Sequence, residues 1–189
     1  MSPIEITAFI LGVINVTLVV RRSLWNYPFG LVMVTLYAVI FYDTKLYSDA
    51  ILQLFFFIVQ LYGWANWSRS KDDTGEVAIV RLATSERALW LGGIVVATAI
   101  WGWGMHRFTD AAFPWWDAGV AMLSVAAQIL MSRRAIENWL LWIAVDVIAI
   151  GLYAAKDLWL TALLYAIFLA LSVWGLTDWR RAEQRAAAA

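Results

Sequence analysis

Three side chains in the C-terminal third of the chain have the types and the spacing to hold a flat, positively charged ring. Trp139, Trp142 and Asp146 are spaced i, i+3 and i+7, which places them on one side of a helix. Two indole rings can stack on such a ring and attract its charge, and a carboxylate can pair with it. The alternative assigns Trp139 to an interfacial aromatic belt and pairs Asp146 with an arginine of another helix. We favour the ligand role because Trp142 lies deeper in the apolar segment than a belt residue should.

The surroundings of Asp146 support a functional role for its carboxylate. It lies in the middle of the apolar stretch WLLWIAVDVIAIGLY. An ionised carboxylate that faced hydrocarbon there would cost about 2.5–3.5 kcal/mol. Asp146 must therefore face a cavity or a partner.

Side-chain amides in the first half of the chain form a second candidate group. Gln53 and Gln60 are spaced i, i+7 on one face, and Asn66 follows near the end of the same apolar segment. Such amides can orient a sugar hydroxyl or a carboxamide, but Gln53 and Gln60 can equally link helices to one another, and a structural role is the simpler one for Asn66. Weaker candidates, for which packing or capping is the simpler role, are Asn15, Asn26, Thr35, Tyr37, Gln128 and Tyr153. Most tryptophans, Trp179 included, are expected to anchor span ends at the membrane interfaces.

The reactive residues that most enzymes use are scarce. The chain has no cysteine, and its single histidine, His106, falls at the end of an apolar segment. Asp146 has no second carboxylate within its helix, so acid–base or metal chemistry is not indicated. We expect no enzyme activity, no cofactor and no metal site. A retinal protein is also excluded, because the last apolar segment, 158–179, contains no lysine for a Schiff base.

The composition indicates a membrane protein. Hydrophobic residues make up 63% of the 189 residues and charged residues 15%, with a mean hydropathy of +0.71. Soluble domains are roughly 45–50% apolar and about 25% charged. A net charge of zero suggests no nucleic-acid partner. The length leaves room for six or seven helical spans of about 20 residues and for no appended soluble domain.

Seven apolar segments are separated by charges, prolines or polar clusters. They cover residues 4–20, 26–42, 47–67, 88–106, 113–131, 136–154 and 158–179. Helices are expected because isolated strands cannot satisfy their backbone polar groups in lipid. When the connecting loops are assigned alternately to two sides, eleven Lys and Arg residues fall on one side and three on the other. The basic side faces the cytoplasm, which places the N-terminus outside and the C-terminus inside.

The chain repeats itself at an offset of 112 residues. Residues 21–67 align without a gap on residues 133–179, with nine identities in 47 positions. The identical residues include Arg21 and Arg133, Asn26 and Asn138, Gly63 and Gly175, and Trp67 and Trp179. Internal repeats in an apolar chain are typical of transporters, whose substrate sites lie between the two halves.

Topology and repeat together predict an all-α membrane protein with seven transmembrane helices in a 3+1+3 arrangement. Two three-helix units can be parallel only if one further span separates them. We expect a first bundle at 1–67, a cytoplasmic loop at 68–87, a linker helix at 88–106, a second bundle at 107–179 and a cytoplasmic tail at 180–189.

Three motifs resemble those of the PnuC-type vitamin transporter family. They are WNYPFG at 25–30, LYGWANW at 61–67 and ENWLLW at 137–142, and the resemblance extends over nearly the whole chain. It implies uptake of nicotinamide riboside, or a related vitamin such as thiamine or riboflavin, across a bacterial inner membrane. It also implies a SWEET-like 3+1+3 fold, a homotrimer, and facilitated diffusion driven by phosphorylation of the imported vitamin.

The resemblance also implies roles for single residues. Trp139 and Trp142 match the family's ligand-stacking WxxW, whereas Asp146 stands where nicotinamide riboside carriers more often have asparagine. This departure leaves the identity of the vitamin open, because a carboxylate suits nicotinamide riboside and thiamine alike.

The other hypothesis for the function is a vitamin-binding membrane subunit that needs a partner ATPase. The repeat disfavours it, since two equivalent bundles suit rocking about a central site.

Overall fold

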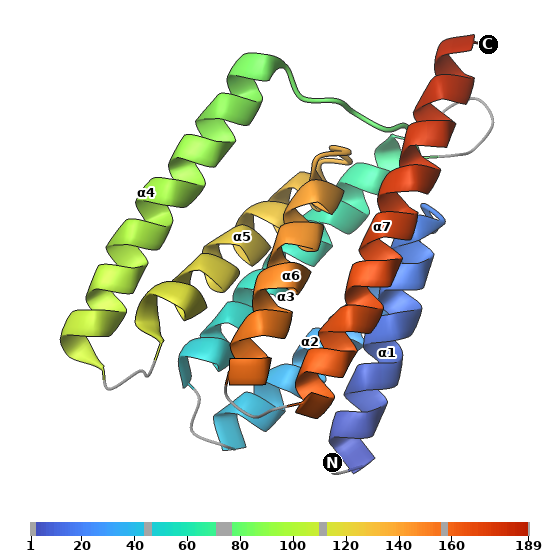
Figure 1. Cartoon of the computed structure of the whole chain (residues 1–189). Coiled ribbons are helices and arrows are strands. Elements are labelled where there is room, and N and C mark those ends of the chain that lie inside the picture. Colours follow the sequence, from blue (N-terminus) through green and yellow to red (C-terminus); the bar gives the residue numbers. More distant parts are fainter. Residues whose placement is uncertain (1–2, 44–46, 71–76, 110–112, 156–158, 189) are drawn as a thin grey trace.

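The computed structural model describes residues 3–43, 47–70, 77–109, 113–155 and 159–188. Within these ranges the chain forms seven helices, shown in Figure 1. They are α1 (Pro3–Val20), α2 (Asn26–Asp43), α3 (Tyr47–Arg69), α4 (Thr84–Phe108), α5 (Pro114–Ser132), α6 (Asn138–Ala155) and α7 (Trp159–Ala188). The prediction of an all-α chain is confirmed.

Two helices extend four or more residues beyond one end of the apolar segments that predicted them. Helix α4 begins at Thr84 rather than residue 88, because the Glu86 carboxylate accepts a hydrogen bond from the Ala83 N–H at 2.8 Å and caps a polar first turn. Helix α7 continues from residue 179 to Ala188. Its added turns consist largely of Ala, Arg, Glu and Gln, which are strong helix formers. Hydropathy marks the apolar part of a helix and not its end.

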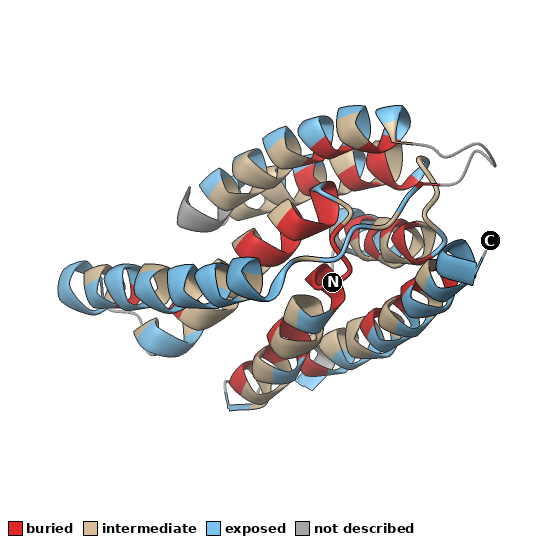
Figure 2. Cartoon of the chain, turned by 90° about the horizontal axis from the view of Figure 1, so that it is seen from above, coloured by how far each residue is buried: buried red, intermediate tan, exposed pale blue. Residues whose placement is uncertain are grey.

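Six of the helices form a closed ring and the seventh lies outside it. Helices α1, α2 and α3 contact one another in chain order, as do α5, α6 and α7, and the ring closes where α3 meets α5 and α7 meets α1. Helix α4 contacts α5 and stands apart from the other five helices (Figure 1). Figure 2 shows that α4 is exposed along almost its whole length, whereas the ring helices bury one side each.

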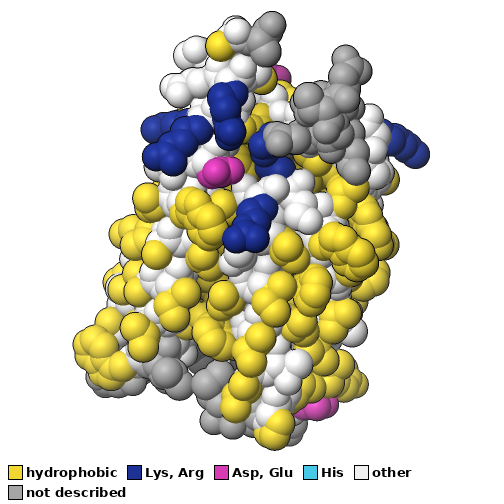
Figure 3. Space-filling view, turned by 90° about the vertical axis from the view of Figure 1, so that its right-hand side faces the viewer, with side chains coloured by type: hydrophobic (Ala, Val, Ile, Leu, Met, Phe, Trp, Pro, Cys, Tyr) yellow, Lys and Arg dark blue, Asp and Glu magenta, His cyan; other side chains and the backbone are white. Residues whose placement is uncertain are grey.

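The outer surface is suited to a lipid bilayer. Among the described residues, four helical stretches are long and apolar enough to span one: Ala50–Arg69, Thr84–Phe108, Asn138–Ala155 and Thr161–Ala188. Figure 3 shows hydrophobic side chains over much of one face, with Lys and Arg gathered toward one end. We call this the basic end. It holds the described arginines Arg21, Arg22, Arg69, Arg133, Arg134, Arg180 and Arg181.

The two halves of the ring correspond at the offset of 112 residues. This shift moves the bounds of α2 onto those of α6, the start of α3 onto that of α7, and the end of α1 onto that of α5. The turns also correspond, since Arg22 and Arg134 both have a left-handed backbone, with φ of 53° and 64°. Asn26 and Asn138 each donate from Nδ2 to the carbonyl three residues earlier at 2.7 Å.

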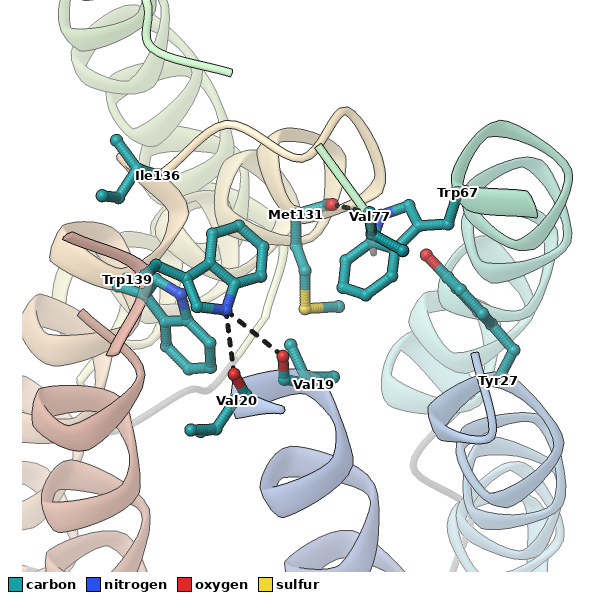
Figure 4. Close-up of a cluster of buried hydrophobic side chains, with 9 residues drawn as sticks. Val19, Val20, Tyr27, Trp67, Val77, Met131, Ile136 and Trp139 are labelled. Carbon is teal, nitrogen blue, oxygen red and sulfur yellow. Dashed lines mark hydrogen bonds between the residues drawn. The ribbon is translucent and has the colours of Figure 1, made fainter. Parts of the chain in front are cut away.

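A cluster of buried hydrophobic side chains, the core cluster, closes the basic end of the ring (Figure 4). It consists of Val19, Val20, Tyr27, Trp67, Val77, Met131, Ile136, Trp139 and Trp179. The expectation that Trp179 is an interfacial anchor is wrong. Its side chain is fully buried, and Nε1 donates to the Val19 and Val20 carbonyls at 3.3 and 3.2 Å. The side of α7 that carries Trp179 faces α1 and not the lipid interface.

Close packing of Gly175 against Trp139 gives a prediction about stability. A Cβ added at Gly175 would lie 2.5 Å from three atoms of the Trp139 ring, which is rigid and buried. We expect Gly175→Ala to lower the free energy of unfolding by about 1–3 kcal/mol, as overpacking does. Thermal unfolding of the detergent-solubilised protein measures it. Gly93→Ala is the matched control, because a Cβ on Gly93 in α4 meets no atom within 4 Å. Equal melting temperatures for the two variants would contradict this packing.

Candidate functional site

The three residues predicted to share a face of α6, Trp139, Trp142 and Asp146, are divided between the core cluster and the interior of the ring. Trp139, in the first turn, is 1% exposed and lies edge-on to Trp179, with ring centroids 5.6 Å apart. Trp142, one turn further on, is half-buried and packs against the core cluster from the side. Asp146 follows at the next turn and is 3% exposed. The three residues share a face as predicted, but Trp139 is enclosed by protein whereas part of Trp142 remains accessible.

The Asp146 carboxylate has a hydroxyl partner on the neighbouring helix. Ser172 of α7 donates from Oγ to Oδ2 of Asp146 at 2.9 Å. Within the described ranges this is the hydrogen bond that Asp146 makes, and it is not the arginine pairing of the alternative reading. Sequence reasoning did not select Ser172. The sequence nevertheless pointed to Ser172, because the offset of 112 residues places it at the position in α7 that Gln60 occupies in α3.

Aromatic rings extend the site from Asp146 toward the end of the ring opposite the basic end. Tyr153 of α6 stacks on Tyr165 of α7 with centroids 5.3 Å apart and planes 21° from parallel. Tyr165 is near enough to Asp146 and to Tyr37 of α2 to interact with both electrostatically. The structure thus brings Tyr153 into the neighbourhood of Asp146. It also brings in Tyr37, which belongs to the other half of the ring.

In the first half of the ring, the side-chain amides of Gln60 and Asn15 both lie next to Gly30. Gln60 is buried, and a Cβ added at Gly30 would lie 2.1 Å from its Oε1 and 2.7 Å from Nδ2 of Asn15. Gly30 is therefore required for this close approach of α1, α2 and α3. Gln53 is half-buried two turns earlier along the same face of α3.

The lower-ranked amides hold the fold together. Asn26 donates to the Ser23 carbonyl, and its own carbonyl accepts from Nδ2 of Asn15 at 2.6 Å. Asn66 donates from Nδ2 to the Ser132 carbonyl at 2.9 Å, which links α3 to α5. Gln128 is buried on α5. The capping and linking contacts of Asn26 and Asn66 agree with the structural role that sequence reasoning preferred for them.

Comparison with known proteins identifies the fold and the family. The family model described as nicotinamide mononucleotide transporter matches residues 2–181. The chain is 31% identical over 204 aligned residues to the nicotinamide riboside transporter PnuC of Escherichia coli (strain K12), covering 95% of this chain and 85% of that protein. It is also 31% identical to the riboflavin/roseoflavin transporter RibM of Streptomyces davaonensis, covering 90% of this chain and 81% of the relative.

A solved structure agrees with the sequence comparisons. The crystal structure of the vitamin B3 transporter PnuC superposes with a TM-score of 0.78 at 31% identity, covering 95% of this chain and 81% of that one. The resemblance to PnuC-type transporters is confirmed, and the protein is a multi-pass membrane transporter. The chain belongs to the nicotinamide mononucleotide transporter family.

Proposed function

We propose that this protein takes up nicotinamide riboside across the bacterial inner membrane by facilitated diffusion, with phosphorylation in the cytoplasm trapping the vitamin. The observation that carries the proposal is the 31% identity to a nicotinamide riboside transporter over 95% of the chain. The candidate site supports it independently. Nicotinamide riboside carries a flat, cationic pyridinium ring, which suits an indole and a carboxylate on one helical face.

The transport architecture proposed is a 3+1+3 parallel repeat in which all seven helices cross the membrane. The matching bounds of α2 and α6 and the matching left-handed turns at Arg22 and Arg134 support it. Helix α4, which contacts only α5 among the described helices, is the extra span that makes the halves parallel. Such repeats move against each other around a site at their interface.

The ligand is proposed to lie inside the ring at the level of Trp142 and Asp146. Trp142 stacks on the pyridinium ring, Asp146 pairs with its charge, and Ser172 orients the carboxylate. Gln60, at the position equivalent to Ser172 in the other half, faces the ribose hydroxyls or carboxamide, with Gln53 and Tyr153 further along the path. Trp139 supports Trp142 from the core cluster, while Asn26, Asn66 and Gln128 position the helices.

Related vitamins are the alternative substrates. The similarity to RibM favours riboflavin as the second candidate. The buried carboxylate of Asp146 favours a cation over riboflavin, which has no net charge, and leaves thiamine as a cationic competitor. A vitamin-binding subunit that depends on an ATPase is the remaining alternative.

A homotrimer is proposed from the family resemblance. The exposed apolar surface of α4 would then contact lipid or neighbouring protomers.

Reconstitution of the protein alone tests the mechanism. Liposomes that contain only this protein are expected to equilibrate labelled nicotinamide riboside and then stop. Coupled carriers use chains of intramembrane ionisable groups, whereas Asp146 is the only charge in the middle of an apolar segment of the sequence. Absence of uptake without an added ATPase would favour the subunit alternative. Accumulation driven by an imposed pH gradient and lost in Asp146→Asn would make Asp146 a coupling site.

Reporter fusions test the proposed orientation. A reporter placed after Ala189 is expected to report the cytoplasm, and one placed before Met1 the periplasm. The reason is the distribution of eleven basic residues on one side against three on the other. If both ends were found on one side, the number of spans would be even and the parallel repeat would be excluded.

A further inference from the structure

The described segment that leads into α4, together with the first turn of α4, is built into the basic end of the ring. We call residues 77–87 the strap. Its first residue, Val77, is 2% exposed and belongs to the core cluster together with Trp67 and Trp179. Figure 4 shows Val77 beside the Trp67 ring. The strap therefore contributes to the core cluster that closes the basic end, and does not merely connect two helices.

Beneath the strap, two equivalent indole hydrogen bonds join the halves of the ring. Trp67 Nε1 at the end of α3 donates to the Met131 carbonyl at the end of α5, at 3.0 Å. In return, Trp179 Nε1 of α7 donates to the Val19 carbonyl at the end of α1. The Val19 and Met131 carbonyls, in the last turns of their helices, also accept from the Arg22 and Arg134 N–H groups at 2.9 Å, and each indole uses the second lone pair of the oxygen. Separation of the halves at this end would break both contacts.

Two arginines at equivalent positions in the two halves donate hydrogen bonds to the backbone of the strap. Arg22 Nη1 donates to the Val77 carbonyl at 3.4 Å, and Arg134 Nη1 donates to the Ala78 carbonyl at 3.1 Å. Both have a left-handed backbone just after a helix, where glycine is the favoured residue. An arginine at such a position gives up the better backbone fit. Its guanidinium makes a contact with the strap that glycine could not make.

The other described contacts of the strap are mostly with the second half. Val80 pairs with the turn before α6, donating to the Arg134 carbonyl at 3.0 Å and accepting from the Ile136 N–H at 2.9 Å. Glu137 accepts from the Leu82 N–H and from Arg87. Arg81 pairs with Glu183 of α7.

Hydrogen bonds with the first half are fewer. They are the Arg22 contact and a hydrogen bond from the Ala78 N–H to the Ser70 carbonyl at 3.1 Å. Val77 also packs in the core cluster, which draws on both halves. The strap is thus bound to both halves but unequally, and the first half is the weaker attachment.

We propose that the strap is a latch that stays on the second half and is released from the first half when the basic end opens. This inference rests on the proposed function, in which the halves move against each other. Val77 and Ala78 cannot keep both arginine contacts once α1 and α5 separate. The two hydrogen bonds with the first half are the ones that break, so Arg22 sets how readily the basic end opens.

A distance measurement tests the latch without any substrate. The sequence has no cysteine, so spin labels can be placed on Ser68→Cys and Arg180→Cys, which are exposed and equivalent in the two halves. Arg22→Gly keeps the left-handed backbone and removes the guanidinium. We expect the distance distribution of Arg22→Gly to contain a longer distance whose population is at least threefold higher than in the parent protein.

Two further variants serve as controls. Arg134→Gly should change the distances little, because Val80 and Glu137 still hold the strap. Arg21→Ala controls for the lost charge. Identical distributions for Arg22→Gly and the parent would refute the latch.

Cross-linking tests the same movement during transport. Oxidation of Ser70→Cys/Ala78→Cys should tie the strap to the first half and lower uptake at least tenfold, with recovery on reduction. Val80→Cys/Ala135→Cys lies within the second half, where these residues are bridge partners, and should transport when oxidised. Undiminished uptake by the fully cross-linked first pair would overturn the proposal. If the parent failed to move the riboside at all, the proposed function would fall, while the distance measurement would still decide the latch.

Discussion

Replacing Trp142 with alanine is expected to weaken the binding of nicotinamide riboside roughly 5- to 150-fold while the protein remains folded. Stacking of a nucleobase on an aromatic side chain contributes about 1–3 kcal/mol, and about 1.4 kcal/mol corresponds to a factor of ten in affinity. Trp142 is half-buried at the side of the core cluster, so its loss should disturb the fold less than loss of the enclosed Trp139. Isothermal titration with the purified protein measures the effect.

Trp103→Ala provides the matched control for this experiment. Trp103 is an exposed tryptophan of α4, outside the ring of six helices. The substitution removes the same ring without touching the proposed site, so the affinity should stay within about twofold of the parent. Equal affinities of Trp142→Ala and the parent protein would show that Trp142 only packs against the core cluster.

Replacing Asp146 with asparagine is expected to weaken binding of nicotinamide riboside about 10- to 150-fold and to affect riboflavin much less. A hydrogen bond or contact with a charged group contributes roughly 1.5–3 kcal/mol, which corresponds to this range. Asparagine has nearly the same size, and its Oδ1 can still accept the hydrogen bond from Ser172. The substitution therefore removes the charge and preserves the local packing.

Ligand-dependent thermal stabilisation of the parent and Asp146→Asn proteins tests this selectivity. A ligand that binds only the folded protein raises its melting temperature by mass action. Nicotinamide riboside and thiamine should lose stabilisation in the variant. Similar losses for the uncharged riboflavin would mean that Asp146 maintains the shape of the site and does not recognise charge. Ser172→Ala, which keeps the carboxylate, should have a smaller effect on the cationic ligands.

The all-helical class and the helical face that Trp142 and Asp146 share could be read from the sequence. These properties depend on composition and on the 3.6-residue period of a helix, which are local. At the offset of 112 residues the bounds of α2 match those of α6, and the turns at Arg22 and Arg134 share a left-handed backbone. The ends of α4 and α7 were less predictable, since polar turns continue a helix without an apolar signal.

The partners of these side chains were decided only by tertiary structure. Sequence spacing places Trp139 beside Trp142, but the rotation of α6 against α7 encloses Trp139 under Gly175 and leaves Trp142 half-buried. The same packing gives Asp146 a serine partner 26 residues away. Trp179 lies 160 residues from Val19, whose carbonyl accepts from its indole. Such contacts depend on how whole helices pack in the ring, and helical periodicity specifies which residues share a face but not what that face meets.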